Sequence, residues 1–211
     1  LKQLGFFARE CNYDIKLLAQ AIGNIKSLSK LELGLTENKV SEKALFYLGQ
    51  NINGLKHLSH LKLLSDGQKA HELLENTIKP LGNLKKLTTY QLEFLGTTNM
   101  TEESIEILSN FLNSHLGLKV LTLKFGNSYF RSISSLRNSL KNLTFLEEFT
   151  LDTAYCQELA GKPVHRIISN LKNMTKLSKF DLSVNDSQMV VENKQGLISR
   201  LQSLENVKSV S

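Results

Sequence analysis

Apolar and polar residues alternate in a short string that recurs along the whole chain. The string reads L-x-x-[LFY]-x-L, and residues 83–104, NLKKLTTYQLEFLGTTNMTEES, contain it as LTTYQL. A period of two is typical of a β-strand with one buried face, so each copy predicts a short strand. The six clear copies are Leu28, Leu31, Leu33; Leu58, Leu61, Leu63; Leu87, Tyr90, Leu92; Leu118, Leu121, Leu123; Leu146, Phe149, Leu151; and Leu177, Phe180, Leu182.

The spacing of these copies predicts an internal repeat. Degenerate copies stand at both ends of the chain, one led by Leu1 and one led by Leu204. Successive leading leucines are 27 to 31 residues apart, and the mean spacing is 29. We therefore expect one domain over residues 1–211, built of about seven periods. Since the chain begins and stops within such strings, we expect it to be a segment of a longer protein.

Between the strings, the apolar residues recur every three or four positions, which is typical of a helix with one buried face. These stripes are Ile15, Leu18, Ile22, Ile25; Leu45, Leu48, Ile52, Leu55; and Ile105, Leu108, Leu112, Leu116. One unit is therefore predicted to be a strand, a turn and a helix. No unit covers its own apolar faces, so neighbouring units must stack.

Two units indicate how the chain enters its helices. Residues 38–48, NKVSEKALFYL, and 99–108, NMTEESIEIL, share the pattern N-x-[VM]-[ST]-E. Ser41 and Thr101 are predicted helix N-caps, with Glu in the first turn, where the helix dipole favours it. Asn38 and Asn99 are expected to hydrogen-bond neighbouring backbone groups. The units at 61–86 and 149–176 depart most from this pattern. We expect loops at 64–73 and 152–165 to add contacts particular to this protein.

These features together resemble the ribonuclease-inhibitor-like class of leucine-rich repeats. The resemblance covers nearly the whole chain. It implies an α/β fold, a curved horseshoe-shaped solenoid with a parallel sheet inside and helices outside. The abundance of Asn and Lys with little Pro also resembles repeat proteins of AT-rich protists such as ciliates.

Composition narrows the setting. No run of 18 apolar residues occurs, so no membrane span is predicted. The only cysteines are Cys11 and Cys156, too few for a disulfide framework, which favours an intracellular, cytoplasmic protein, with a cilium or the cytoskeleton as further settings.

The sequence contains no motif typical of catalysis. His57 and His60 lack a third ligand at metal-binding spacing, and nothing orients Cys156 toward His165. We expect no enzyme activity, cofactor, metal or small-molecule substrate.

The sheet face that points away from the helices is the first candidate binding surface. By the alternation rule its charged and polar residues point into the concavity. These residues are Lys30, Glu32, His60, Lys62, Gln91, Glu93, Thr122, Lys124, Glu148, Thr150, Asp152, Lys179 and Asp181. Both signs of charge occur, with acidic residues around Glu148. A nucleic acid would be repelled there, whereas a protein partner suits mixed charges. A merely solvated face is the alternative.

A basic edge is the rival surface. Lysines recur near the predicted helix exits, and the net charge of the chain is +6. The lysines are Lys26, Lys56, Lys85, Lys86 and Lys172. They are explained either by favourable interaction with the helix dipoles or by an acidic partner.

The sequence therefore predicts a non-catalytic scaffold that binds a protein partner, such as a structural component of a large intracellular assembly. The alternative is a regulatory or substrate-recognition arm of a larger enzyme: a GTPase-activating protein, a ubiquitin ligase or a kinase.

Overall fold

The computed structural model describes residues 1–9, 15–36, 40–66, 69–96, 98–125, 127, 132–154, 156, 167–171, 174–183, 196, 199, 201, 204, 207 and 209–210. Within them, eight strands form one sheet in sequence order, and each strand pairs in parallel with the next. The strands are β1 Gln3–Arg9, β2 Lys30–Thr36, β3 His60–Asp66, β4 Thr89–Leu95, β5 Val120–Lys124, β6 Glu148–Asp152, β7 Lys179–Ser183 and β8 Ser209–Val210. The fold is an α/β solenoid of repeated strand-and-helix units.

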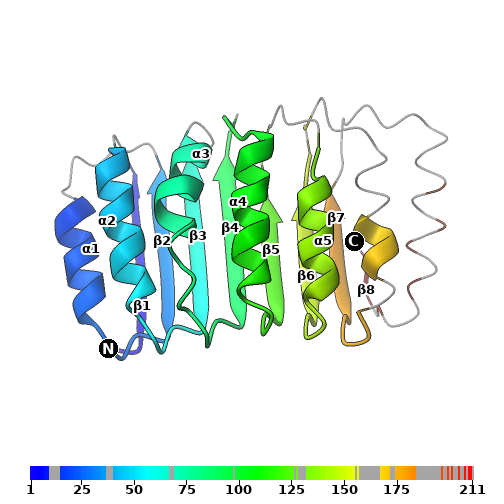
Figure 1. The fold of residues 1–211 in the computed structure, drawn as a ribbon, viewed down its shortest axis with the longest axis horizontal. Helices are drawn as coiled ribbons and strands as arrows, with labels where there is room; N and C mark the ends of the chain where they lie inside the picture. The colour runs from blue at the N-terminus through cyan, green and yellow to red at the C-terminus, as the bar shows by residue number, and fades with distance from the viewer. Residues whose placement is uncertain are drawn as a thin grey trace.

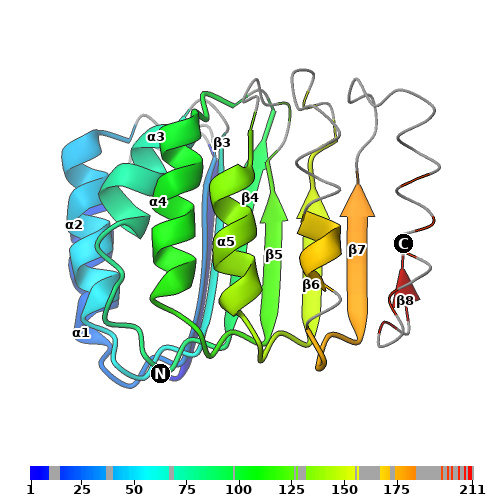
Figure 2. The same ribbon diagram turned by 45° about the vertical axis from the view of Figure 1, so that its right-hand side comes forward.

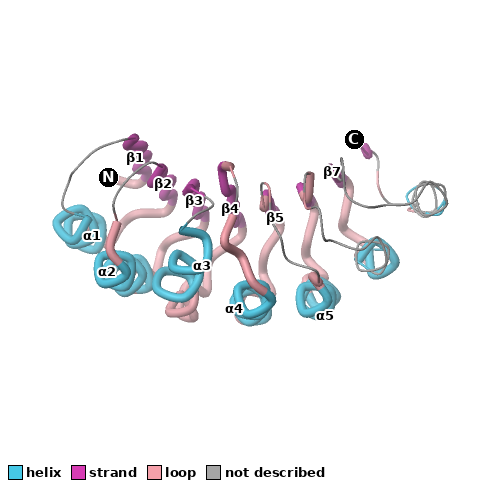
Figure 3. Tube along the Cα trace, turned by 90° about the horizontal axis from the view of Figure 1, so that it is seen from above, coloured by secondary structure: helices cyan, strands magenta, loops and turns pink. Residues whose placement is uncertain are grey.

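The helices cover one face of this sheet (Figures 1 and 2). They are α1 Ile15–Asn24, α2 Glu42–Asn53, α3 Ala70–Leu73, the π-helical turn η2 Leu74–Ile78, α4 Glu102–Asn113 and α5 Ser134–Asn142. Seen from above, the strands and helices form two layers along a shallow arc, with the strands on its inner side (Figure 3). The other sheet face, which we call the inner sheet face, is not covered by these helices.

The strand strings stack in register, which builds the core. Leu31 lies beside Leu61 and Leu61 beside Tyr90, and the column continues through Leu121 to Phe149 and Phe180. All six side chains are at most 1% exposed. Because an apolar residue of one unit packs on its equivalents in the next, each unit completes its neighbour's core.

The predicted helix starts are confirmed for α2 and α4. The Ser41 side chain accepts a hydrogen bond from the Ala44 backbone N–H, at 3.3 Å. Thr101 and Ser104 form a reciprocal capping box, in which each side chain accepts from the other residue's backbone N–H. Asn99 also behaves as expected, since its Oδ1 accepts from the His71 N–H of the preceding unit. Asn38 lies outside the described residues.

The prediction for Leu116 is wrong. Its side chain is 48% exposed, while His115 is only 4% exposed. Helix α4 ends at Asn113, and the next buried residue stands three positions after Leu112, as Leu55 stands three positions after Ile52 at the end of α2. His115 takes the buried place three residues before the next strand string, where Leu55, Leu84 and Leu143 stand in other units.

The unit at 61–86 departs from the pattern because its helix is short and irregular. Helix α3 has four residues and continues directly into the π-helical turn η2. The buried Thr77 hydroxyl donates to the Leu45 carbonyl oxygen of α2, at 3.0 Å. A side chain at Gly49 would place its Cβ 2.7 Å from the Asn76 carbonyl oxygen. Glycine is therefore required where η2 meets α2.

Candidate protein-interaction surfaces

The inner sheet face carries the polar residues that the alternation rule assigned to it. Along β2 and β3, residues on the inner sheet face such as Lys30 and Lys62 are half-buried, while the leucines that alternate with them are buried. Glu148 and Lys179 are exposed, and Thr122 is 8% exposed. The other predicted members are half-buried: Glu32, His60, Gln91, Glu93, Lys124, Thr150, Asp152 and Asp181. The structure thus brings all 13 predicted residues to this face.

Most charges on the inner sheet face are paired with one another. Lys30 Nζ lies 2.8 Å from Glu32 Oε1 on the same strand. Glu93 pairs with two lysines from neighbouring strands, at 3.0 Å to Lys62 and 3.5 Å to Lys124. These half-buried pairs fix the orientation of the long side chains and offset their charges.

His60 joins this network as a neutral ring. Burial lowers its pKa, the Lys30 charge lowers it further, and the nearby Glu32 carboxylate acts in the opposite direction. The hydrogen bond from Lys30 lowers the pKa of Glu32 against the effect of burial. His60 Nε2 lies 3.4 Å from Glu32 Oε1. At neutral pH this contact joins a neutral imidazole to a carboxylate.

Strand β6 presents acidic groups on the inner sheet face. Glu148 is exposed and forms no ion pair within the described part of the chain. Asp152 accepts a hydrogen bond from the Ala154 N–H, at 2.9 Å. Next to them, Asp181 pairs with Lys179 at 3.2 Å and accepts from the Thr150 hydroxyl at 3.3 Å. Among the described residues, Glu148 and Asp152 form no ion pair, although Lys179 and Lys124 lie beside them in the strand register.

Sequence reasoning missed an apolar patch at the other end of this face. Phe7 is 57% exposed and lies beside Gly34 in the strand register. A Cβ at Gly34 would stand 2.6 Å from Phe7 Cδ1, so the ring covers this glycine. Leu64, next in the row, is half-buried. Continuing the period-two rule from Leu4 and Phe6 would have placed Phe7 in this row.

The predicted basic edge lies along the turns that lead into the strands. We call this surface the turn edge, and define it by the two central residues of each turn: 26–27, 56–57, 85–86, 116–117, 144–145 and 175–176. All twelve residues are exposed. Each turn is closed by a backbone hydrogen bond, as from the Leu58 N–H to the Leu55 carbonyl. Lys26, Lys56, Lys85 and Lys86 stand here. Lys172 lies outside the described residues.

A ladder of hydrogen bonds holds successive turns together. The backbone N–H of Ser59 donates to the Ser29 carbonyl, and the Ser59 hydroxyl donates to the same oxygen at 3.1 Å. The equivalent hydroxyls of Ser29, Thr88 and Ser178 do likewise. Lys119 and Glu147 occupy the two intervening places and pair with each other at 2.9 Å. The turn edge is therefore a rigid surface.

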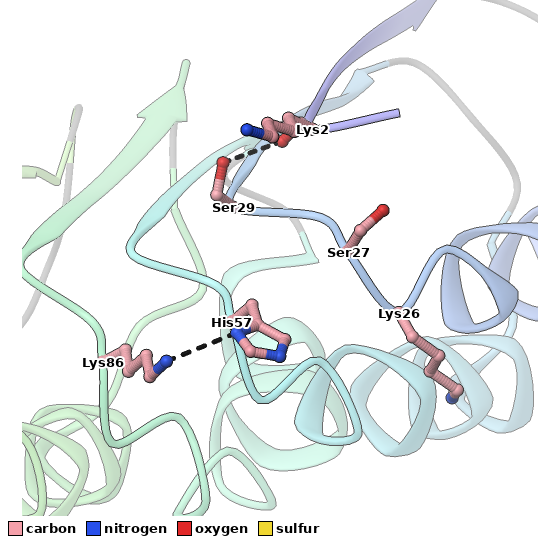
Figure 4. Close-up of a pocket in the computed structure, with 6 residues that line it drawn as sticks. All are labelled: Lys2, Lys26, Ser27, Ser29, His57 and Lys86. Atoms are coloured by element: carbon pink, nitrogen blue, oxygen red, sulfur yellow. Dashed lines mark hydrogen bonds between the residues drawn. The ribbon is translucent and has the colours of Figure 1, made fainter.

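Two adjoining hollows open on the turn edge. The first has a volume of about 570 Å³ and is lined by Lys2, Lys26, Ser27, Ser29, His57 and Lys86 (Figure 4). The second, of about 600 Å³, is lined by Gln50, Asn53, Gly54, Lys56, Asn83, Lys85 and Lys86. Lys86 borders both, and its ammonium group donates to His57 Nδ1 at 3.3 Å.

The described residues contain no group of three His, Cys, Asp or Glu side chains placed to hold a metal ion. His57 lies in an exposed turn, whereas His60 faces the inner sheet face. Cys156 is buried, and His165 lies outside the described residues, as do Gly67, Gly161 and Pro163 of the predicted loops. Among the described helices, none is long and apolar enough to span a bilayer.

Comparisons with known proteins were made on sequence and on structure. No protein-family model matches the sequence, and no curated protein matches it. Among solved structures, the chain is similar to the tropomodulin C-terminal domain of Caenorhabditis elegans, with 13% sequence identity and a TM-score of 0.48. The match covers 92% of this chain and 93% of that domain.

Proposed function

We propose that this chain is a non-catalytic scaffold that binds a protein partner on its inner sheet face. In this proposal the solenoid belongs to the ribonuclease-inhibitor-like class of leucine-rich repeats and continues the arc into a horseshoe. The scaffold acts inside the cell, where Cys156 stays reduced, as a component of a larger assembly.

One observation carries the proposal: a rigid sheet presents fixed polar side chains on the face that the helices leave uncovered. Hydrogen-bonded strands hold the backbone, and the ion pairs of Glu93 and Glu32 hold the side chains. A surface organised before binding loses little conformational entropy on association. Its ion pairs set the pattern of charge that a partner must match.

The distribution of acidic and apolar residues along the inner sheet face indicates which groups a partner would present to each end. Glu148 and Asp152 form no direct ion pair with the lysines of the described sheet, so both carboxylates can accept a basic group of the partner over β6. Phe7 offers an apolar contact at the opposite end, over β1 and β2. A partner that spans the face therefore combines a basic region with an apolar one.

The first experiment is cross-linking mass spectrometry on the protein purified from its source, to identify the partner. We expect cross-links from Lys62 and Lys124 of the inner sheet face to one recurrent protein. Lys43 and Lys79, on the helical side, serve as the internal comparison. Recurrent links only from these helical lysines would contradict the proposal.

The second experiment is charge reversal on the inner sheet face. With the identified partner, Glu148→Lys combined with Asp152→Lys is expected to weaken binding at least about tenfold, since attraction to a basic group becomes repulsion. The control is Glu103→Lys with Glu106→Lys, two exposed residues on the outer helix α4. Both variants change the net charge equally. Equal affinities of the two variants, measured by calorimetry, would refute binding over β6.

A further inference from the structure

In the part of the chain that the structure describes, the lysines of the turn edge lack the carboxylate partners that neutralise most lysines of the inner sheet face. Lysines on the sheet, such as Lys62 and Lys124, have carboxylate partners. The turn-edge lysines, by contrast, form no ion pair within the residues that the structure describes; they are Lys26, Lys56, Lys85, Lys86 and Lys176. No acidic side chain is among the described residues lining either hollow. Positive charge is therefore concentrated here without internal compensation.

The lysine rows extend from one unit to the next. Lys26, Lys56 and Lys85 each stand two residues before a leading leucine, so they occupy the same place in successive turns. Lys26 Nζ lies 3.8 Å from where a Cβ on Gly54 would stand, and Gly54 lines the second hollow. The Lys26 side chain thus reaches over the next turn and links the two hollows.

Beyond Lys85, each of the next two turns of the turn edge exposes a large apolar side chain. In the next turn the place of Lys85 is taken by Leu116, which is 48% exposed. One turn further, Phe145 is 49% exposed, and Lys176 Nζ lies over its ring, 4.2 Å from the centroid. The lysine rows are therefore followed, at the next two turns, by an exposed apolar patch formed by Leu116 and Phe145.

We infer that the turn edge binds an extended acidic segment of a partner protein, whose carboxylates lie over the lysines and whose adjoining apolar side chain lies on Leu116 and Phe145. This site is separate from the inner sheet face and does not depend on the function proposed for that face.

A peptide fits these features better than a nucleic acid or a membrane. A nucleic acid needs a longer row of cations, whereas here the lysines give way to Leu116 and the Lys119–Glu147 pair. The two hollows that these lysines border are shallow and open, and an extended chain can follow such a depression, whereas a broad bilayer surface would span it. The mixed order, basic and then apolar, matches a peptide whose side chains change along its length.

The inference is tested with a labelled synthetic peptide in which a glutamate run is followed by leucine. Fluorescence anisotropy is measured with the whole chain, and we expect binding that weakens as salt is raised, because salt screens exposed charges. A peptide with glutamine in place of glutamate should not bind. Replacing the peptide leucine by serine should weaken binding several-fold, as should Leu116→Ser in the protein.

Charge reversal locates the site. Lys56→Glu with Lys85→Glu is expected to weaken peptide binding about tenfold or more, because attraction becomes repulsion at two turns. The matched control is Lys43→Glu with Lys69→Glu. Lys43 lies in the first turn of α2, where the helix dipole favours an acidic residue. Lys69 is the N-cap of α3 and pairs with Glu72 at 3.9 Å, a weak contact that the reversal removes. Circular dichroism checks that both variants fold.

Three outcomes would overturn the inference. One is unchanged peptide binding by the Lys56→Glu and Lys85→Glu variant. Another is equal loss in the matched control, which would show an effect of net charge alone. The third is adsorption to phosphatidylserine vesicles through Lys56 and Lys85 without peptide binding, which would assign the edge to a lipid surface. The Glu148→Lys and Asp152→Lys variant should keep full peptide affinity. Either proposed site can therefore be rejected without affecting the other.

Discussion

His115 is a polar residue in a place that the other described units fill with apolar side chains. The ring is stacked beside Phe111, with centroids 4.2 Å apart, and Nδ1 donates to the Phe111 carbonyl oxygen at 2.7 Å. Nε2 is buried and makes no hydrogen bond of normal geometry among the described residues, although the Leu81 carbonyl interacts with the ring. Burial lowers the pKa of His115, the Lys85 charge lowers it further, and the Phe111 and Leu81 carbonyls act in the opposite direction. The fold therefore holds this ring neutral.

We predict that His115→Leu stabilises the protein by about 1 kcal/mol at neutral pH, because it removes a buried unpaired nitrogen. The folded-state pKa lies below the unfolded value of about 6.5, so the unfolded chain binds more protons as the pH falls through that value. Wild-type stability is thus full above about pH 6.5 and declines toward the folded-state pKa, and the variant should decline less.

Urea denaturation at neutral and mildly acidic pH measures both effects. His60 also has a lowered pKa, so some pH dependence should persist in the variant. His57→Leu, in an exposed turn, is the control and should leave the stability of the buried core unchanged. A variant that loses stability at neutral pH would show that the imidazole packs better than leucine at this place.

At the scale of the element, the irregular helix of the third unit packs closely on α2 because α2 carries no side chain at Gly49. The π-helical turn η2 presses its backbone carbonyls against α2 at Gly49, and Pro80 Cγ completes the contact. Backbone atoms are fixed by their own helix and do not move aside as a side-chain end does.

Gly49→Ala is expected to destabilise the chain by about 1–3 kcal/mol through overpacking, although alanine favours a helix by about 1 kcal/mol. A Cβ there would lie 2.8 Å from the Thr77 carbonyl oxygen. Gly23→Ala in α1 is the matched control. Its new methyl would meet the movable side chain of Asn51 instead of backbone atoms.

Thermal unfolding compares the two variants. The Gly23 variant should lose clearly less stability than the Gly49 variant, since Asn51 can rotate away. If the two alanines were equivalent, close approach of η2 to α2 would not be the reason for glycine.

At the scale of the whole molecule, in-register columns join all the units into one structure. Leu92 is fully buried and lies between Leu63 and Leu123 in the register of β3, β4 and β5. Each unit therefore contributes to the core of the units before and after it.

We predict that Leu92→Ala lowers the free energy of unfolding by about 2–5 kcal/mol. The strands next to β4 should be destabilised more than distant ones. Hydrogen–deuterium exchange followed by mass spectrometry should show lost protection in β3 and β5 as well as β4, with β1 affected least. Uniform loss across every strand would instead indicate that the solenoid unfolds as one cooperative unit.

Much of this architecture could be predicted from the sequence, because its signals are local and repeated. The strand strings, the caps at Ser41 and Thr101 and the row of Lys30 and Lys62 follow from side-chain periods and from backbone groups a few residues away. The misassigned Leu116 shows where such reasoning ends. A helical stripe allows a step of three or four residues beyond Leu112, and the turn that Leu55 and His115 share in their units requires three.

The charged residues of the candidate surfaces could be predicted, but the ion pairs that they form could not. Sequence places Lys62 and Lys26 on different surfaces. It does not say that Lys62 reaches Glu93 on the next strand while Lys26 extends over a neighbouring turn. Such pairings depend on diagonal distances between units, which a one-dimensional pattern does not contain.

The hydroxyl ladder of the turn edge also bears on how the chain is made. Each hydroxyl donates backwards, from Ser29 to Lys2, from Ser59 to Ser29 and from Thr88 to Ser59. The acceptor in every case belongs to a residue synthesised earlier. During translation, each new turn can therefore form this bond with a unit that has already been made, and the bond needs no residue that is synthesised later.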